Sequence, residues 1–321
     1  MAPSAAIVAR RLTRKFGDRV AVNGVSFEVA RGEVFGFLGP NGAGKSTTAR
    51  MLTGFIPPTS GAASIAGFDV SSQSTAARRH IGVVPEEANV YADLTVLQNV
   101  LLMAELHGLD RPERISRGTQ LLERFGLAER ARQKGSDLSK GLRQRLMLCM
   151  ALVSSPEILF LDEPTSGLDV ASARLIREIV AELNRQRGMT VFLTTHNMEE
   201  ADQLCHRVAI IKEGILAAID APHALRDRVE SRRSVEVRFR EMRPGYLELL
   251  GKEHVEDVLA MPNGFRAFTR QPGPLAQRIV LNAAAQGLTI ESISTLEPTL
   301  EDVFMTITAA TAVRDASDGG H

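Results

Sequence analysis

The chain has 321 residues, of which 44% are hydrophobic and 24% are charged, a composition typical of a globular protein with a large core. Basic and acidic residues both number 38, so the overall charge gives no general attraction to nucleic acid or to an acidic surface. No apolar run approaches the roughly 18 residues that a membrane-spanning helix needs, and the apolar stretch 5–9 is too short for a signal peptide. Any membrane role is therefore expected to depend on a partner.

The first predicted elements are two strands, residues 7–16 and 20–29, joined by a hairpin-type turn at Gly17-Asp18. Phe16 ends the first strand. An aromatic side chain at this place could stack on an adenine ring, whereas a lone phenylalanine is more often part of a core. Both interpretations stay open on the strand pattern alone.

A glycine-rich stretch follows the apolar run 34–38, which is predicted to be a buried strand, and precedes a helix that begins near Lys45. Its spacing, Gly39, four residues, then Gly44-Lys45-Ser46, is that of a phosphate-binding loop. Glycines let backbone amides surround a polyphosphate, Lys45 would reach the β- and γ-phosphates, and the Ser46 hydroxyl would ligate Mg²⁺. The pattern predicts a nucleoside triphosphate site formed by Gly39, Pro40, Asn41, Gly42, Ala43, Gly44, Lys45, Ser46 and Thr47.

The middle of the chain changes from strands to helices. Residues 81–85 form a predicted buried strand that is followed by the pair Glu86-Glu87. Between 95 and about 134, apolar residues recur at helical spacing, which indicates an all-helical insert. A further helix follows 139–141 and contains Cys149, which we expect, like Cys205, to be a buried and reduced thiol in a cytosolic setting.

An acidic pair follows the next predicted strand, residues 158–161. Asp162 would hold Mg²⁺ from the side opposite to Ser46, and Glu163 would act as general base on a water molecule. Strand 190–195 ends at His196, which is well placed to contact a γ-phosphate. The helix 171–187 lies between these strands, and five apolar residues are predicted to face inward: Leu175, Ile176, Ile179, Val180 and Leu183.

Taken together, these segments resemble the nucleotide-binding subunit of an ABC transporter, and the resemblance covers nearly the whole chain. Residues 138–145, Leu-Ser-Lys-Gly-Leu-Arg-Gln-Arg, resemble the signature motif of that family. Residues 166–169 resemble its D-loop, and Thr194-Thr195-His196 its switch histidine. The resemblance implies an α/β fold with a P-loop NTPase (RecA-like) core, an antiparallel β subdomain and an α-helical insert at about residues 94–153.

The resemblance also implies roles for single residues. In the family, the aromatic residue at the position of Phe16 stacks on adenine, and the acid at Glu163 activates the attacking water. The signature residues, here Ser139 and Gly141, close over the ATP that the other subunit holds, and Asp169 of the D-loop belongs to the same ATP-binding set. A head-to-tail dimer with two sandwiched ATP molecules is therefore expected, with ATP and Mg²⁺ as ligands. The sequence leaves open whether the dimer is homo- or heteromeric, although both halves of the site motifs in one chain favour a homodimer.

Two departures from the family pattern narrow the interpretation. Glu86 replaces the usual glutamine, and in the signature Lys140 replaces the second glycine while Leu142 replaces the final glutamine. This pattern is similar to the branch that serves ABC-2-type exporters of drugs, sodium, polysaccharides and lipids, and it argues against an importer. Lys140 would add a cation near the partner's phosphates. The expected catalytic residues are Glu163, His196, Lys45 and Glu86, and the expected Mg²⁺ ligands are Ser46, Asp162 and Glu86.

The predicted domains are an ABC ATPase domain at 1–221, a C-terminal accessory or regulatory domain at 222–310 and a disordered tail at 311–321. Between 234 and 295 the order strand, helix, strand, strand, helix, strand predicts a small ferredoxin-like α+β domain. Residues 297–304 resemble the C-terminal segment of such export ATPases. A stabilising appendage and a regulatory or partner-docking role both remain open for this domain.

The combined interpretation is a cytosolic ATPase subunit that powers a separate multi-span permease from the cytoplasmic face of the membrane, with no nucleic acid partner. One alternative is an ABC-type ATPase that acts on ribosomes or DNA. The single cassette, the lack of heptads and the balanced charge argue against it. Another alternative is a regulator that binds ATP without significant turnover. Glu163 and His196 argue against that role, whereas Glu86 leaves it open. The sequence does not identify the transported substrate.

Overall fold

The computed structural model describes residues 5–87, 89–228, 233–241, 250 and 255–307. The chain divides into two compact units, Met1–Asp220 and Ala221–His321. None of the described helices is both long and apolar enough to cross a membrane.

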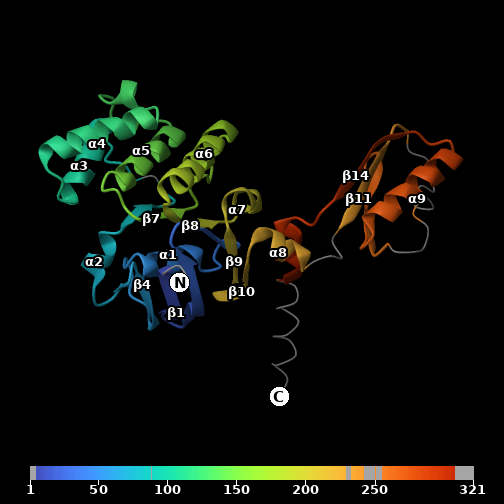
Figure 1. Ribbon diagram of the computed structural model, residues 1–321, viewed down its shortest axis with the longest axis horizontal. Helices are drawn as coiled ribbons and strands as arrows, with labels where there is room; N and C mark the ends of the chain where they lie inside the picture. Colours follow the sequence, from blue (N-terminus) through green and yellow to red (C-terminus); the bar gives the residue numbers. More distant parts are fainter. Residues whose placement is uncertain (1–4, 88, 229–232, 242–249, 251–254, 308–321) are drawn as a thin grey trace, which may run out of the picture. The chain divides into compact units, whose positions relative to one another are not determined.

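The first unit is built on a six-stranded sheet with the order β10-β9-β3-β8-β7-β6 (Figure 1). Five of these strands run parallel, and β10 pairs antiparallel with β9 at one edge. The three central strands, β3, β7 and β8, are short apolar runs buried on both faces, as expected of a parallel sheet covered on both sides. Their bounds are β3 Val34–Leu38, β6 Ile81–Val84, β7 Ile158–Asp162, β8 Thr190–Thr195, β9 Arg207–Lys212 and β10 Ile215–Asp220.

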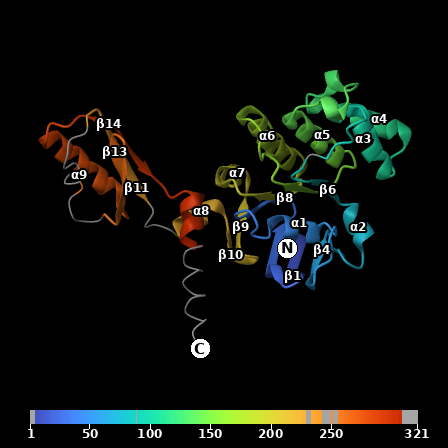
Figure 2. The same ribbon diagram turned by 180° about the vertical axis from the view of Figure 1, so that it is seen from behind.

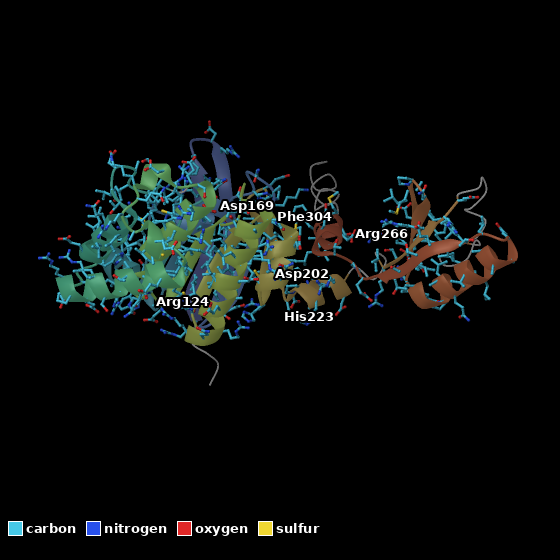
Figure 3. The ribbon with its side chains drawn as sticks, turned by 90° about the horizontal axis from the view of Figure 1, so that it is seen from above. Arg124, Asp169, Asp202, His223, Arg266 and Phe304 are labelled. Carbon is cyan, nitrogen blue, oxygen red and sulfur yellow. The ribbon has the colours of Figure 1, made fainter. Side chains whose placement is uncertain are left out.

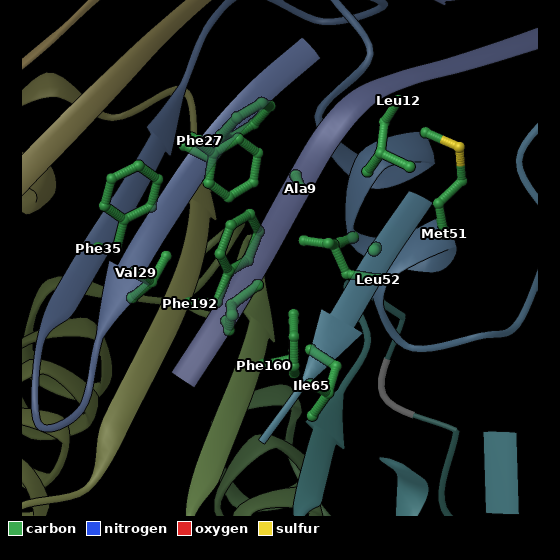
Figure 4. Packing of buried hydrophobic residues seen from close by; sticks show 14 of the residues in the cluster. Ala9, Leu12, Phe27, Val29, Phe35, Met51, Leu52, Ile65, Phe160 and Phe192 are labelled. Atoms are coloured by element: carbon green, nitrogen blue, oxygen red, sulfur yellow. The ribbon is translucent and has the colours of Figure 1, made fainter. Parts of the chain in front are cut away.

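A second sheet, with the order β2-β1-β4-β5, forms the predicted antiparallel subdomain. Its first two strands meet at the predicted turn, where Gly17 has φ of 57°. The core that joins the two sheets is rich in phenylalanine (Figure 4): the ring of Phe27 on β2 lies 5.4 Å from Phe35 and 5.9 Å from Phe192 of the main sheet. Its strands are β1 Ala5–Phe16, β2 Arg19–Ala30, β4 Ser60–Ile65 and β5 Phe68–Asp69.

The predicted helical insert is present, and its helices gather on the side of the main sheet that faces away from β1 and β4 (Figures 1 and 2). The start of its first helix is fixed by a capping box in which Thr95 and Gln98 satisfy each other's backbone amides. The insert contains α3 Val96–Leu106, α4 Arg111–Arg124 and α5 Lys140–Leu152, with short 3₁₀ turns at Ala128–Arg130 and Gly135–Asp137. The remaining helices of the unit are α1 Lys45–Leu52, α2 Ser74–Arg78, α6 Val170–Arg187 and α7 Met198–Leu204.

One predicted core residue of α6 lies outside the core. Ile176, Val180 and Leu183 are buried and Ile179 is partly buried, whereas Leu175 is 36% exposed and the prediction that it faces inward is wrong. The buried residues follow one another at intervals of four and three, which keeps them on a single stripe of the helix. Leu175 is rotated by about 100° from Ile176 and so falls beside that stripe.

Both cysteines are buried free thiols, as predicted. Burial raises the pKa of the Cys149 and Cys205 thiols well above the usual value. Neutral thiols of this kind are poor nucleophiles and metal ligands, so both residues have a structural role, and the Cys149 thiol donates to the Leu121 carbonyl oxygen at 3.7 Å.

The second unit contains α8 Pro222–Asp227, a four-stranded antiparallel sheet with the order β12-β13-β11-β14, and a helix at 300–307. Leu275, Ile279 and Ala283 of α9 belong to the core that this sheet covers. The strand order and α9 agree with the predicted ferredoxin-like succession. The predicted helix 245–251, apart from Leu250, and the predicted disordered tail 311–321 lie outside the described residues. The bounds are β11 Ser234–Phe239, β12 Asp257–Met261, β13 Gly264–Phe268, α9 Pro272–Ala285 and β14 Ile290–Leu296.

Candidate functional site

The predicted phosphate-binding loop, the acidic pair and the histidine come from the ends of three neighbouring parallel strands at the same edge of the main sheet. The glycine-rich loop leaves β3, the acidic pair lies at the end of β7, and His196 follows β8. In the register, Leu38 pairs with Thr195 and Asp162 pairs with Thr194. The carboxyl edge of an open parallel sheet is where such folds bind ligands.

The loop between β3 and α1 has the backbone shape that requires its glycines. Gly42 and Gly44 have φ of 82° and 106°, in the region that side chains disfavour. A Cβ atom on Gly44 would lie 2.6 Å from the carbonyl oxygen of Ala21, so the loop also packs directly on β2. Gly44 is the N-cap residue of α1 and has no side chain to accept bonds from the first-turn amides. These amides and the helix dipole remain available to an anion.

Lys45, the first residue of α1, is only 6% exposed and curls back across the loop. Its Nζ donates hydrogen bonds to the carbonyl oxygens of Gly39, at 2.8 Å, and Pro40, at 3.2 Å. The same ammonium group forms an ion pair with Glu163, 3.1 Å from Oε1. Lys45 therefore ties the loop to the strand end that carries the acidic pair.

Ser46 and Asp162 meet across the site. The Ser46 hydroxyl donates to Asp162 Oδ1 at 3.1 Å, and the Thr194 hydroxyl donates a short hydrogen bond to the same oxygen. A serine hydroxyl and one carboxylate are the oxygen donors that a Mg²⁺ ion uses when the remaining ligands are phosphates and water. The donor set therefore fits Mg²⁺ bound together with a nucleotide. Among the described residues, no group of three or more His, Cys, Asp or Glu side chains forms a metal site without a nucleotide.

Glu163 lies between Lys45 and His196 and has an unusual backbone. Its φ is 50°, a left-handed value that costs a non-glycine residue energy, and its side chain is 6% exposed. Oε2 pairs with Nδ1 of His196 at 2.7 Å, while Lys45 faces Oε1. His196 itself is half exposed, so one ring nitrogen contacts Glu163 while the ring remains accessible. Backbone strain and a buried charge together mark this residue as a functional candidate.

Phe16 is exposed beside the phosphate-binding loop and does not join the core. Its ring is 47% exposed, and the guanidinium of Arg14 lies 4.6 Å from the ring centroid. Its cross-strand neighbour is Arg19, whose Nη2 lies 4.0 Å from the position of a Cβ on Gly42. The hairpin therefore holds an open aromatic face near the loop, which is the geometry of a base-stacking platform.

Glu86 lies two residues beyond the end of β6, which pairs with β7 in parallel. It therefore belongs to the same edge of the sheet as Asp162. Its side chain is exposed, and within the part of the chain that the structure describes it has no hydrogen bond or ion pair. The structure places Glu86 at the rim of the site, apart from the Lys45–Glu163–His196 group.

Ser139, Gly141 and Asp169 lie at the starts of two helices that pack against each other. Ser139 and Asp169 are the N-cap residues of α5 and α6, and Asp169 accepts two hydrogen bonds from Ser172 (Asp169 is labelled in Figure 3). These bonds lower the pKa of Asp169. A Cβ on Gly141 would lie 2.6 Å from Ser172 Oγ, so the start of α5 packs tightly on the start of α6. In the described ranges, Ser139 and Asp169 form no hydrogen bond with residues 39–47.

Lys140, expected near a partner's phosphates, turns toward its own chain. Its Nζ lies 2.5 Å from the position of a Cβ on Gly167, so it covers the loop that precedes α6. The signature segment and the D-loop segment of one chain are therefore in direct contact.

Sequence reasoning missed three residues that support the site: Thr194, Thr165 and Glu200. Thr194 bonds Asp162, and its carbonyl oxygen accepts from the Glu163 amide at 3.0 Å. Thr165 donates to the buried Glu200 at 2.9 Å. Hydroxyl residues in an otherwise apolar strand were the available signal for Thr194. Nothing in the local sequence indicates that Glu200 is buried.

Comparison with known proteins gives consistent matches. The family model described as "ABC transporter" matches residues 22–166. The linearmycin resistance ATP-binding protein LnrL of Bacillus subtilis is 34% identical over 94% of this chain and 98% of its own length. Nod factor export ATP-binding protein I of Rhizobium meliloti strain 1021 is 37% identical over 95% of this chain and 89% of its own length.

Solved structures agree on the fold of the first unit. An ATP-binding subunit of an ABC transporter superposes with a TM-score of 0.64 at 30% identity, covering 70% of this chain and 92% of that one. A dimeric ATP-binding cassette in a post-hydrolysis state, bound to ADP and Pi, superposes with a TM-score of 0.62 at 28% identity, covering 67% of this chain and 98% of that one.

Proposed function

The chain belongs to the ATP-binding subunits of ABC transporters, in the ABC-2-type exporter branch, and from this premise we propose how its residues divide the work of binding and hydrolysing ATP. The subunit binds ATP and hydrolyses it to drive export. The observation that carries the residue assignment is the group Lys45–Glu163–His196, assembled from the ends of β3, β7 and β8.

ATP binds with its phosphates in the loop 39–47 and its adenine on Phe16. The loop amides, the N-terminus of α1 and Lys45 bind the phosphates, and Arg14 supports the aromatic ring from behind. Because Lys45 forms an ion pair with Glu163, a bound γ-phosphate would compete for the same ammonium group. Lys45 then turns toward the phosphate, and the carboxylate of Glu163 becomes available to a water molecule.

Hydrolysis proceeds by attack of that water on the γ-phosphorus. A new oxygen–phosphorus bond forms, the bond to the bridging oxygen breaks, and Glu163 accepts the proton that the water loses. Lys45 and His196 stabilise the negative charge on the transferred and leaving oxygens. Ser46, Asp162 and Glu86 would hold Mg²⁺, which would neutralise part of the phosphate charge.

A second copy of the chain completes each site. Ser139 and Gly141 cap the ATP of the partner, and Asp169 lies at the same interface, in a head-to-tail C₂ dimer. Ser139 and Asp169 bond to the first turns of their own helices and, among the described residues, not to their own phosphate loop, which supports their use in the partner's site. The dimeric relative that holds ADP and Pi supports the same arrangement. The dimer closes on ATP and reopens when hydrolysis removes the γ-phosphate contacts.

A separate multi-span permease transmits this motion and holds the subunit at the cytoplasmic face of the membrane. The names of the relatives, which describe ATP-binding proteins for Nod factor export and for linearmycin resistance, support an export system. A short helix of the permease would enter the groove between Glu86 and the helical insert. The second unit acts as an accessory domain that regulates the ATPase or docks a partner.

The experiment that tests this proposal is affinity purification of the Glu163→Gln protein from detergent-solubilised membranes in the presence of ATP. The substitution removes the base but keeps the shape, so ATP stays bound and the dimer stays closed. A stoichiometric multi-span membrane protein is expected to copurify, and the purified variant is expected to lose ATP hydrolysis while retaining ATP.

A Lys45→Ala/Glu163→Gln protein, which lacks the phosphate-binding ammonium, serves as the control for dependence on ATP. Recovery of a dimer without any membrane protein, or of ribosomes or nucleic acid, would contradict the exporter role. Full ATP hydrolysis by the Glu163→Gln protein would contradict the assignment of the base.

A further inference from the structure

A second buried carboxyl group lies directly behind the catalytic residues. Glu200 is part of α7, the helix that follows His196, and its side chain has no exposed surface. Its backbone amide donates to Asn197 Oδ1 at 3.1 Å, so the first turn of α7 fixes where the side chain starts. The proposed steps of ATP hydrolysis give this residue no role.

The carboxyl group of Glu200 joins the segment after His196 to the segment after Glu163. Oε1 accepts a hydrogen bond from the hydroxyl of Thr165, which lies two residues after Glu163. Glu200 itself lies in α7, four residues after His196. Burial raises the pKa of Glu200, whereas the neighbouring hydroxyl groups of Thr195 and Thr165 act in the opposite direction. One buried side chain thus bridges the two loops that carry the base and the histidine.

The bonding of Glu200 differs from that of an ordinary buried carboxylate. Its Oε2 is buried without a hydrogen-bond partner in the described part of the chain. By contrast Glu33, another buried carboxylate, accepts from the Ala30 amide at 2.7 Å and pairs with Arg207 at 3.2 Å. A carboxyl group with an unbonded oxygen is expensive to bury, and an apolar side chain at the same place would avoid that cost.

We propose that Glu200 is a positioning residue: by joining Thr165 to α7, the helix that follows His196, it holds the Glu163 loop and the His196 loop at the separation at which their side chains meet. This inference rests on the proposed roles of Glu163 and His196. Their contact, Oε2 to Nδ1 at 2.7 Å, joins two different strand ends and depends on the spacing between them. Because misplacing a catalytic group by about 1 Å can cost roughly 100-fold in rate, a small relaxation of either loop would slow hydrolysis.

The test compares steady-state ATP hydrolysis by full-length variants. Glu200→Ala removes the bridge and is expected to lower kcat by roughly 10- to 100-fold with KM for ATP within about threefold, because the phosphate-binding loop is untouched. Glu200→Gln retains an oxygen that accepts from Thr165 and is expected to stay within about threefold of wild type. Thr165→Val, which removes the hydroxyl and keeps the shape, is expected to resemble Glu200→Ala.

Two further variants distinguish a loss of positioning at the site from a general loss of stability. The Thr165→Val/Glu200→Ala protein is expected to be no slower than Glu200→Ala, since both substitutions remove the same bond. Glu33→Gln, at an equally buried carboxylate away from the site, is expected to leave kcat unchanged per folded molecule. If Glu200→Ala does not fold, the inference is tested by comparing kcat of the Thr165→Val protein, expected to be low, with kcat of the Glu200→Gln protein, expected to be near that of wild type.

Wild-type kcat in folded Glu200→Ala or Thr165→Val protein would overturn the inference, and so would a Glu200→Gln protein as slow as Glu200→Ala. The Glu163→Gln protein in the same assay tests the proposed function separately. Hydrolysis by wild type and its loss in Glu163→Gln would support that function, whatever the result at position 200. A wild-type protein that fails to hydrolyse ATP would overturn both.

Discussion

Charged residues lie at both edges of the main sheet, but their carboxylates differ in how completely they are hydrogen-bonded. At the amino edge, Glu33 accepts an amide and pairs with Arg207, while Glu157 pairs with Arg31 at 2.7 Å and His80 at 2.8 Å. At the carboxyl edge, Glu163 and Glu200 each keep a buried oxygen without a hydrogen bond among the described residues. Lys45 lies near Glu163 Oε1 without being aligned for a hydrogen bond.

The completeness of hydrogen bonding distinguishes carboxylates that stabilise the fold from carboxylates that act on a ligand. A carboxylate whose partners are all protein groups gains nothing from a ligand, because its bonding is complete. A strained, partly bonded carboxylate beside a free loop can exchange its protein partner for a substrate. The surface cavity at the amino edge, lined by residues such as Arg31, Glu157 and Arg187, therefore carries no functional assignment.

The largest expected effect is on ATP binding by Lys45→Ala. Removing the ammonium leaves the phosphates without their main buried cation and is expected to weaken ATP binding by at least about 100-fold, equivalent to roughly 3 kcal/mol. Binding is measured by fluorescence titration with a labelled ATP analogue. The control is Arg50→Ala, which removes an exposed cation from the same helix. An equal loss of ATP affinity in both variants would contradict a specific role of Lys45 in binding the phosphates.

An intermediate effect is expected at the amino edge. Glu33→Ala leaves the Ala30 amide and Arg207 without their partner, and we expect the free energy of unfolding to fall by about 1–3 kcal/mol. ATP hydrolysis per folded molecule should not change. Chemical denaturation and an ATPase assay check these two results, and a combined Glu33→Ala/Arg207→Ala protein should lose less than the sum of the single losses. A large fall in kcat would contradict the structural role.

The smallest effect concerns pH. The hydrogen bond from His80, followed by the pairing with Arg31, lowers the pKa of Glu157 below its ordinary value of 4.5. A lowered folded-state pKa means that the stabilisation is present above 4.5 and is lost as the pH falls through the folded-state value. Because the pair is exposed, its contribution is under about 1 kcal/mol. Wild type and Glu157→Gln should therefore differ slightly in melting temperature at pH 6 and converge near pH 3, and a difference that grows toward acid pH would contradict the sign.

Local patterns were sufficient for most of the fold. The strand bounds around the phosphate loop, the helical insert and the order of the C-terminal strands follow from apolar periodicity, glycine turns and capping residues, which act within a few residues of one another. Leu175 was predicted wrongly because helical periodicity alone does not fix the width of the buried stripe. Packing against α7 and β8, to which α6 is adjacent, sets that width.

The sequence by itself determined the chemistry of this protein, because each motif brings its own residue types: glycines for the phosphate loop, Lys45 and Ser46 for the phosphates and metal, and an acid at a strand end. Only the tertiary structure decided which charged side chains form ion pairs or hydrogen bonds with one another. The Lys45–Glu163–His196 group joins residues more than a hundred positions apart, and Glu200 is buried only because α7 returns behind β8. Such partnerships depend on sheet order and strand register, which no local pattern specifies.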